Sequence, residues 1–322
     1  MAKIYYLCPD YEPPSGGTRR LYSQVWQLRQ RGLDAYIVHQ KSEFRLTWHG
    51  IDVPTRSLAD PLGVQENDVL VVPEPLWAIF KQLSSINITK LLIVLNWAPS
   101  YWNLPLGENW SDYGVQAVLT PSQVIADYVK WRMNMPVHIF GSYINQKLYS
   151  YDAKSKQPLI AYTPRKCPDA DIIRSVLEKK TNLFGQFSWQ PMIDMSETEY
   201  AQQLRQATFY LTPSAREGFN ISVLEAMACG CIVIGYHGVG GREYMIGTGD
   251  KQNCILVENG DLPQFGHLVE KVLIHWQNNP QPYTKLIKNA IATASQYQNS
   301  EREAQQLSQI FQQFLPLKKP KT

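Results

Sequence analysis

Short apolar runs, rich in β-branched and aromatic residues, alternate along the chain with longer segments whose apolar residues recur at helical spacing. Residues 18–32 show the second pattern, in which Leu21, Val25 and Leu28 fall on one helical face before a glycine ends the repeat. Continuous apolar strands between such helices are typical of a parallel sheet that is covered on both faces. The pattern therefore predicts an α/β fold.

The same two patterns locate the elements. Strands are predicted at residues 3–7, 35–39, 68–73, 90–96, 116–122, 137–140, 158–164, 187–189, 208–214 and 231–236. Helices are predicted at residues 18–32, 123–133, 169–180, 196–207, 221–229, 260–277 and 300–315. Ser122 follows a proline directly before one of these helices, which predicts that it is the N-cap.

A polar stretch divides the chain into two similar halves. The 322 residues are long for one core and suit two domains. The polar segment at residues 145–157 is the candidate linker, because the alternation of strands and helices restarts after it. We therefore predict two Rossmann-like domains that face each other across a cleft, at residues 1–150 and 151–299, followed by a terminal segment at 300–322.

Composition and charge exclude several classes of protein. Apolar residues make up 44% of the chain, which excludes a disordered protein, and a net charge of +3 is too small to indicate a nucleic-acid partner. No segment approaches the roughly 18 apolar residues that span a bilayer, and the N-terminus lacks the apolar run of a signal peptide. Five cysteines without ligand-like spacing favour a reducing compartment, so a cytoplasmic location is expected.

Two smaller features each have two interpretations. Cys229 and Cys231 flank a glycine in an apolar stretch, which favours core residues. Metal ligands are the alternative interpretation, but no His or Cys partner motif accompanies the pair. The basic tail LPLKKPKT at residues 315–322 either is simply solvated or makes a weak peripheral contact with an anionic membrane.

Ligands of open α/β sheets bind beyond the carboxyl ends of the strands, so the loops that leave the strands are the candidate sites. Gly16 and Gly17 lie between the first strand and the first helix. Backbone amides at a helix N-terminus favour an anion such as a phosphate, although an ordinary tight turn would also use these glycines.

A second candidate follows the first strand of the second half. Arg165 and Lys166 come directly after that strand. Adjacent cations at this position suit a leaving diphosphate, whose developing charge needs fixed positive partners. A solvated basic turn is the alternative interpretation.

Residues 214–236 place two glutamates around a glycine-marked turn at a strand end. Glu217 precedes the glycine of this turn, where an acid is an acceptor for hydroxyl groups. Glu225 either binds hydroxyls too or caps its own helix, because Ser222 and Glu225 match the Ser-x-x-Glu capping box. One acid for the hydroxyls of a sugar, one for those of a ribose, and turn amides between them would form a sugar-nucleotide site.

The stretch EGFNISVLEAMACG at residues 217–230 resembles the Glu-x7-Glu signature of retaining nucleotide-sugar glycosyltransferases of the two-Rossmann GT-B fold, in particular glycosyltransferase family 4, the group 1 type. Its usual form is EGFG-x-x-x-LEAMA-x-G, followed by an apolar strand and a glycine-rich loop. This chain supplies both as CIVIGY and HGVGGREYM. Weaker similarities are the early glycine loop, a TPS strand end at residues 120–122, the linker and the final helix.

The resemblance implies an activity. A hexosyl group would move from a nucleotide-diphosphate sugar, with a UDP- or GDP-sugar as donor, to an acceptor with retained anomeric configuration. The acceptor would be a glycan, a glycolipid or a small molecule, as in polysaccharide biosynthesis. No cofactor and no metal ion are implied, and no enzymatic nucleophile, since the leaving phosphate takes the acceptor proton on the same face.

The resemblance also implies roles for residues. Glu217 and the backbone of Gly218, Phe219, Asn220 and Ile221 would hold the donor sugar, Glu225 the ribose, Gly16 and Gly17 the diphosphate, and Arg165 and Lys166 the leaving group. The domain at 1–150 would take the acceptor and the domain at 151–299 the nucleotide sugar. The helix within 300–322 would return to the first domain, so that the two domains are joined twice and close by a hinge.

The chain departs from the family pattern at several positions. Its two cations are adjacent rather than spaced, its signature contains EGFN in place of EGFG, and Asn96 and Trp97 stand where many members have a histidine. The segment between the linker and the signature is short, which predicts a second domain that lacks one βα unit. These departures keep two alternatives open: a degenerate, sugar-nucleotide-binding partner of another transferase, and a nucleotide-sugar epimerase, against which the signature argues. The sequence predicts no oligomeric state.

One motif bears on the prediction that no metal is needed. Asp169 and Asp171 form an Asp-x-Asp shortly after a strand, as in metal-dependent transferases of another fold. Pro168 precedes them and a helical pattern follows, so the acids fit a first helical turn, where the helix dipole stabilises negative charge. We therefore expect them to be helix-start residues.

Overall fold

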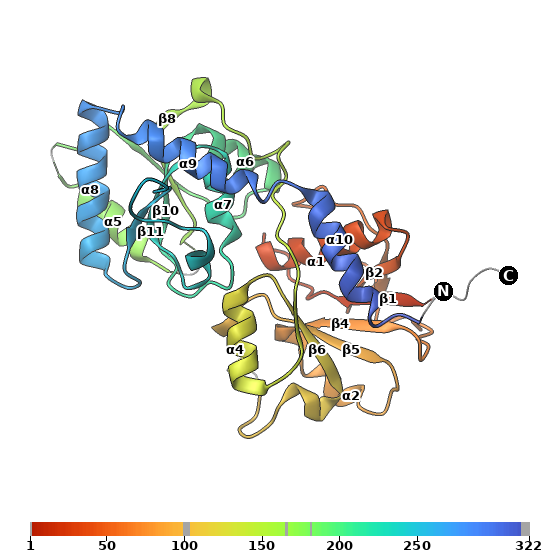
Figure 1. Ribbon diagram of the computed structural model, residues 1–322. Coiled ribbons are helices and arrows are strands. Elements are labelled where there is room, and N and C mark those ends of the chain that lie inside the picture. The colour runs from red at the N-terminus through yellow and green to blue at the C-terminus, as the bar shows by residue number, and fades with distance from the viewer. Residues whose placement is uncertain (1, 99–103, 165–166, 181, 317–322) are drawn as a thin grey trace. The chain divides into compact units, whose positions relative to one another are not determined.

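The computed structural model describes residues 2–98, 104–164, 167–180 and 182–316 (Figure 1). The chain divides into two compact units, each with its own sheet and cores. Unit 1 comprises residues 1–142 and 300–322, and unit 2 comprises residues 143–299. The first division thus falls at residue 142, whereas the sequence predicts residue 150.

Unit 1 is built on a seven-stranded sheet in the order β3-β2-β1-β4-β5-β6-β7, and every pair of neighbours is parallel. Its strands are β1 (Lys3–Leu7), β2 (Asp34–His39), β3 (Thr55–Ser57), β4 (Val69–Pro73), β5 (Thr89–Ile93), β6 (Val115–Thr120) and β7 (Val137–Ile139). Its helices are α1 (Gly16–Gln30), α2 (Ile79–Gln82), α4 (Gln123–Met133) and α10 (Ser300–Gln312), with the 3-10 turns η1 (Glu74–Leu76) and η2 (Trp110–Tyr113).

The strands of unit 1 bury both faces, as their continuous apolar runs predict. Successive side chains point to opposite faces of a sheet. Tyr6 of β1 accordingly lies in a core with α1 and α10, whereas its neighbour Tyr5 lies in a second core with α2 and α4. Both faces of the sheet are therefore covered by helices, which leaves the loops at the strand ends as the places where a ligand can bind.

Helix α10 packs on α1, although almost the whole chain separates them. Its apolar residues Leu307, Ile310 and Phe311 are buried in the core that α1 covers. Glu303 is 2% exposed, and it accepts hydrogen bonds from Arg20 (2.5 Å) and Gln27 (2.7 Å) of α1. Burial raises the pKa of Glu303, while Arg20 and Gln27 act in the opposite direction. The terminal helix is thus part of the structure of unit 1.

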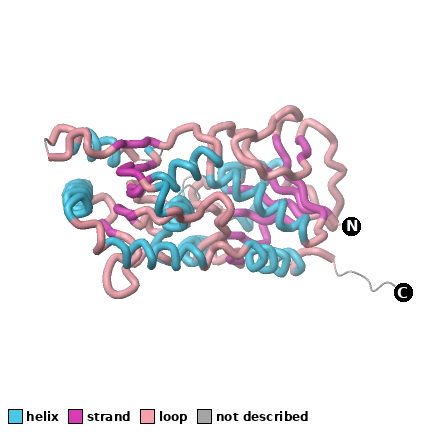
Figure 2. Tube along the Cα trace, turned by 90° about the horizontal axis from the view of Figure 1, so that it is seen from above, coloured by secondary structure: helices cyan, strands magenta, loops and turns pink. Residues whose placement is uncertain are grey.

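Unit 2 contains a five-stranded parallel sheet in the order β12-β11-β10-β8-β9. Its strands are β8 (Gln157–Tyr162), β9 (Ser188–Pro191), β10 (Ala207–Thr212), β11 (Ile232–Tyr236) and β12 (Ile255–Val257). Its helices are α5 (Asp169–Leu177), α6 (Glu197–Gln206), α7 (Ile221–Ala228), α8 (Leu262–Asn278) and α9 (Tyr283–Ser295), with the 3-10 turns η3 (Ala153–Ser155) and η5 (Gly240–Glu243). Helices α6 and α7 cover one face, α5 and α8 cover the other, and α9 contributes side chains to both cores. Figure 2 marks these helices and strands along the trace.

The α/β fold class predicted from the sequence is confirmed: the structure contains two parallel sheets between helices. Ser122 is the N-cap of α4, as predicted, and its hydroxyl accepts the Ile125 N–H at 3.2 Å. The predictions from the sequence include neither the strands β3 and β12, which are only three residues long, nor the helices α2 and α9. No helix in the described residues is long and apolar enough to cross a membrane.

Candidate functional site

The strand order of unit 2 indicates where a ligand should bind. Strand β8 pairs with β9 on one side and with β10 on the other, so the direction of the chain's progress through the sheet reverses between β8 and β10. Ligands of doubly wound sheets bind beyond the carboxyl ends of the strands at such a switch point. The loop after β10 contains Glu217, and the loop after β8 contains Arg165 and Lys166, which lie outside the described residues. The described part of the predicted site in unit 2, the turn with Glu217, thus follows a strand at the switch point of this sheet.

The turn that contains Glu217 is bound to the loop that follows β11. We call residues 215–220 the glutamate turn and residues 237–241 the glycine loop. The Glu217 N–H donates to the carbonyl of Gly238 at 2.7 Å, and the Gly240 N–H donates to the carbonyl of Glu217 at 3.1 Å. These two bonds form a short parallel bridge between Glu217 and Val239. The backbone of Glu217 is therefore held by the neighbouring loop.

The glycines of this loop are required by the close approach of the two backbones. A Cβ on Gly240 would lie 2.3 Å from the carbonyl oxygen of Gly218, which is backbone and cannot move aside as a side chain can. A Cβ on Gly238 would lie 2.8 Å from Cγ of Glu217, and Gly238 also has a positive φ of 62°. The glycine loop therefore packs directly against the backbone of Gly218 and the side chain of Glu217.

Asn220 explains why the chain contains EGFN rather than EGFG. It is the N-cap of α7 and has the left-handed conformation, with φ 60° and ψ 57°. Glycine adopts this conformation freely, and asparagine is among the few other residues that tolerate it. The Asn220 side chain donates to Thr212 Oγ1 at 3.1 Å instead of capping the helix. Asparagine at residue 220 is therefore compatible with the left-handed conformation of the glutamate turn.

The capping interpretation of Glu225 is wrong. Helix α7 begins at Ile221 after the N-cap Asn220, so Ser222 lies inside the helix and cannot form the Ser-x-x-Glu capping box with Glu225. Glu225 is 2% exposed. Burial raises the pKa of Tyr210 to about 12, and the charges of Glu225 and Glu217 both act in the same direction. The charges of both acids therefore act on the same buried tyrosine.

The other residues of unit 2 that are predicted to bind the sugar donor are mostly buried. Gly218 is buried under the glycine loop, and Ile221 is the first residue of α7. The Phe219 ring is 6% exposed and packs against Tyr244 and Tyr297, with ring centroids 5.5 Å and 5.7 Å away. The Phe219 side chain is therefore a core residue, and its carbonyl accepts the Tyr244 hydroxyl at 3.0 Å. The N-terminus of α7, where first-turn N–H groups lack the regular partner four residues earlier in the helix, is the part of this segment that suits a ligand.

Gly16 and Gly17 belong to unit 1. Helix α1 begins at Gly16, so both glycines form its first turn rather than the connection before it. Ser15 is the N-cap, but its side chain makes no capping hydrogen bond. In the sheet of unit 1 the switch point falls between β1 and β4, and α1 follows β1. The N-terminus of α1 is therefore at the position where a ligand of this sheet is expected.

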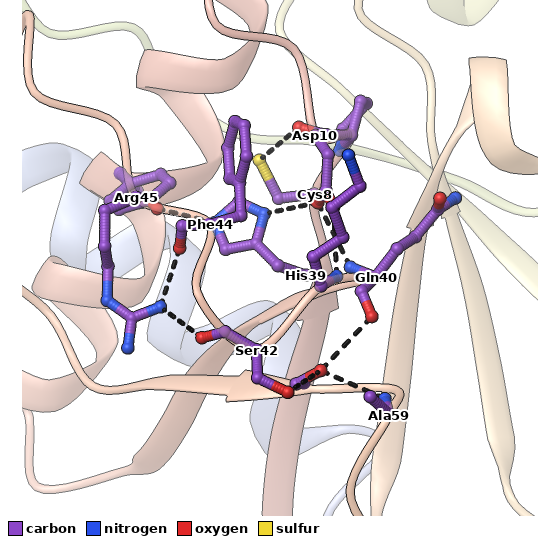
Figure 3. A network of polar contacts seen from close by, with 12 residues as sticks. Cys8, Asp10, His39, Gln40, Ser42, Phe44, Arg45 and Ala59 are labelled. Carbon is purple, nitrogen blue, oxygen red and sulfur yellow. Dashed lines mark hydrogen bonds and ion pairs between the residues drawn. The ribbon is translucent and has the colours of Figure 1, made fainter.

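Two polar networks at the strand ends of unit 1 were not predicted. In one, the Nε2 atom of His39 is 2.7 Å from the Tyr22 hydroxyl. The Nδ1 atom of the same ring is 3.0 Å from Asp10 Oδ1 (Figure 3). Burial lowers the pKa of His39, and Asp10 opposes this. In the other, burial raises the pKa of Glu74 to about 7, although its carboxyl group accepts the N–H groups of Leu95 and Asn96. The sequence offered one signal for both networks, namely a histidine or an acid at the end of a predicted strand.

Asp169 and Asp171 lie in the first turn of α5, as predicted. Asp169 accepts the hydroxyl of Tyr236 at 2.9 Å, and Asp171 accepts the hydroxyl of Tyr162 at 2.6 Å. Both tyrosines belong to strands of the sheet, so these bonds attach α5 to β8 and β11. Among the described residues, no group of three or more His, Cys, Asp or Glu side chains could hold a metal ion.

Comparison with known proteins identifies the class. Residues 179–293, which include the glutamate turn and the glycine loop, match the family described as glycosyl transferases group 1. The chain is 23% identical over 243 residues to an alpha-1,6-glucosyltransferase of Actinobacillus pleuropneumoniae serotype 7, covering 72% of each protein. The resemblance inferred from the Glu-x7-Glu signature is thus confirmed by a match between residues 179–293 and the group 1 glycosyltransferase family. Membership of family 4 in particular stays a prediction.

Solved structures confirm the GT-B type of fold. The sucrose-phosphate synthase of Thermosynechococcus elongatus has a TM-score of 0.74 at 15% identity, over 97% of this chain and 99% of that one. Anabaena Alr3699/HepE in complex with UDP-glucose has a TM-score of 0.73 at 15% identity, over 97% and 100%. At this level of identity the similarity concerns the fold.

Proposed function

We propose that this protein is a retaining glycosyltransferase that moves a hexosyl group from a nucleotide-diphosphate sugar to an acceptor hydroxyl without a metal ion. The observation that carries the proposal is the glutamate turn bound to the glycine loop, at the switch point of the sheet and inside the segment that matches group 1 glycosyltransferases. UDP-glucose is the first donor to test, because HepE was crystallised with it and the relative from Actinobacillus is a glucosyltransferase.

Each predicted residue has a role in this proposal. The Glu217 carboxylate accepts hydrogen bonds from donor hydroxyls, the N-terminus of α7 donates to the donor, and Glu225 binds the ribose. The bond from the anomeric carbon to the diphosphate breaks while the bond to the acceptor oxygen forms on the same face. The acceptor proton passes to the departing phosphate oxygen, and Arg165 and Lys166, with the N-terminus of α1 at Gly16 and Gly17, stabilise the negative charge.

The location and the partners follow from the same proposal. All five cysteines are free thiols, which supports a reducing compartment such as the cytoplasm. The acceptor is a glycan, a glycolipid or a small molecule of polysaccharide biosynthesis. A weak membrane contact through the basic tail is a further part of the proposal, because its lysines would be attracted to anionic lipids. Residues 317–322 of this tail lie outside the described residues.

A donor panel tests the activity. The full-length protein is expected to release UDP from UDP-glucose, faster when an acceptor sugar is added, because the acceptor supplies the nucleophile. Nucleotide release is measured for UDP- and GDP-sugars, and the product's anomeric configuration is read by NMR. Binding without turnover would instead support a degenerate partner protein, and sugar isomerisation without nucleotide release would support an epimerase.

Metal dependence is the second test. Activity is expected to survive exhaustive chelation, since two cations and backbone amides already neutralise the diphosphate in this proposal. Asp169→Asn and Asp171→Asn should leave turnover nearly unchanged, because an amide oxygen still accepts the hydroxyls of Tyr236 and Tyr162. The proposal for the diphosphate would be wrong if chelation abolished activity, magnesium or manganese restored it, and either variant were inactive.

A further inference from the structure

Val239, in the middle of the glycine loop, has a strained backbone. Its φ of 72° and ψ of −58° lie outside the regions that a β-branched residue normally adopts. Such a conformation costs on the order of 1–3 kcal/mol and persists only where the surrounding structure determines it, commonly at functional sites. The contacts that hold Val239 in this conformation therefore indicate which residues maintain the glycine loop.

The backbone N–H groups on both sides of Val239 all have named acceptors. The Val239 N–H donates to Nδ1 of His237 at 2.9 Å, and the Gly238 N–H donates to Oδ1 of Asn259 at 3.2 Å. The Gly240 N–H donates to Glu217, and the Gly241 N–H donates to the carbonyl of His237 at 2.8 Å. Two of these four N–H groups thus have backbone carbonyls as acceptors, and the other two depend on the side chains of His237 and Asn259.

His237 contributes to the loop through its Nδ1 atom, which accepts the N–H of Val239. An imidazole that accepts at Nδ1 carries its proton on Nε2, so the bond to Val239 requires the neutral ring. Burial lowers the pKa of His237, Arg242 of η5 acts in the same direction, and Glu258 after β12 opposes them. The accepting form therefore persists at neutral pH. A side chain that accepts the N–H two residues ahead imitates the turn that Asn and Asp commonly make.

The position of this loop bears on Glu217 directly. Because a Cβ on Gly238 would lie 2.8 Å from Cγ and 2.9 Å from Cβ of Glu217, the Glu217 side chain packs against the bare backbone of Gly238. A shift of residue 238 would remove the surface that orients the carboxylate. An error of about 1 Å in a reacting group can cost about 100-fold in rate.

We propose that His237 and Asn259 are positioning residues, which hold the glycine loop against the glutamate turn and so orient the Glu217 carboxylate towards the donor sugar. This inference rests on the proposed function, and it adds two residues outside the Glu-x7-Glu signature. Neither residue needs to touch the substrate. The role requires only a hydrogen-bond acceptor at residue 237 and another at residue 259.

Two substitutions of one residue separate this role from a general structural one. His237→Phe keeps a ring of similar size but removes the acceptor, whereas His237→Asn is smaller but keeps an acceptor for the N–H of Val239. We expect His237→Phe to lower kcat by about 10-fold to 100-fold, with the affinity for UDP alone nearly unchanged. His237→Asn should recover most of the activity. Asn259→Leu, which also removes an acceptor, should behave as His237→Phe does.

The pH profile supplies a readout that folding does not affect. Protonation of Nδ1 removes the acceptor, so wild-type kcat should fall as the pH falls through the lowered pKa of His237. His237→Asn cannot be protonated there, and it should lose less of its activity than wild type as the pH falls below about 6.5, the ordinary pKa that burial lowers in His237. A thermal melt will show whether His237→Phe folds. If it does not, the comparison of wild type with His237→Asn still tests the role of His237.

The outcomes distinguish the inference from the function on which it rests. If wild type turns over a nucleotide sugar but His237→Phe is equally active, or His237→Asn is as inactive as His237→Phe, the inference is wrong and the function stands. If wild type binds a donor without turnover, the ratio of the affinities for UDP-glucose and UDP is measured in place of kcat. This ratio should be lowered in His237→Phe and largely recovered in His237→Asn. If it binds no donor, both are wrong.

Discussion

Replacing Glu217 by glutamine is expected to lower kcat/KM by about 100-fold or more while leaving the melting temperature almost unchanged. In the proposed function, the carboxylate accepts hydrogen bonds from hydroxyls of the donor sugar, and the loss of one well-placed polar partner in a site costs about 10²–10³ in rate. Glutamine keeps the size of the side chain and both backbone bonds to the glycine loop. Steady-state kinetics with the best donor of the panel and a thermal melt of the same samples measure both effects.

Glu178→Gln is the matched control for this substitution. Glu178 is an exposed acid of unit 2 that pairs with Arg174 at 2.8 Å, and surface pairs of this kind contribute about 0–1 kcal/mol. Its activity should equal that of wild type. A Glu217→Gln protein with full activity would refute the role of Glu217 as the acid that holds the donor sugar.

Gly240→Ala should lower the stability of unit 2 substantially. The added Cβ would lie 2.3 Å from the carbonyl oxygen and 2.4 Å from the carbonyl carbon of Gly218, so one of the two backbones must move. Overpacking of a tight site costs about 1–3 kcal/mol or more. We expect a lower free energy of unfolding for unit 2, measured in urea by hydrogen exchange of its peptides, together with a loss of activity because the glutamate turn is displaced.

The same substitution at Gly266 is the control. Gly266 lies inside α8, where an added Cβ meets only Ile173 at an ordinary 3.9 Å. Alanine in a helix interior is more favourable than glycine by about 0.5–1 kcal/mol, so Gly266→Ala should stabilise unit 2. If Gly240→Ala were as stable and active as Gly266→Ala, the close packing of the two loops would not be a requirement of the fold.

Local pattern was sufficient for most of the fold. The run CIVIGY was predicted as a strand because it is continuously apolar, and β11 is indeed buried along its whole length. Helix α9 was not predicted, although Tyr283, Leu286, Ala290 and Ala294 recur at helical spacing and are its buried residues. The short strands β3 and β12 offer no periodicity, and only their pairing with β2 and β11 makes them strands.

The site was less predictable, for a physical reason. The signature located the glutamate turn, since its residues are adjacent in sequence. The Ser-x-x-Glu pattern left capping open as one of two interpretations of Glu225, and that alternative is wrong because α7 begins after the left-handed Asn220, which bonds to Thr212. The contribution of His237 and Asn259 depends on a bond between residues 21 positions apart and on a strained conformation, neither of which has a sequence pattern.

The bond between Arg20 and Glu303 joins residues 283 positions apart, and this has a consequence for the order of folding during synthesis. The ribosome completes every residue of unit 2 before it adds the helix that covers α1 in unit 1. Until then the cationic Arg20 lacks its acidic partner, and the apolar face of α1 lacks the side chains of α10. The part of the chain that is made first is therefore finished last, and an arrested or truncated product that ends near residue 299 would contain a complete second unit and an incomplete first one.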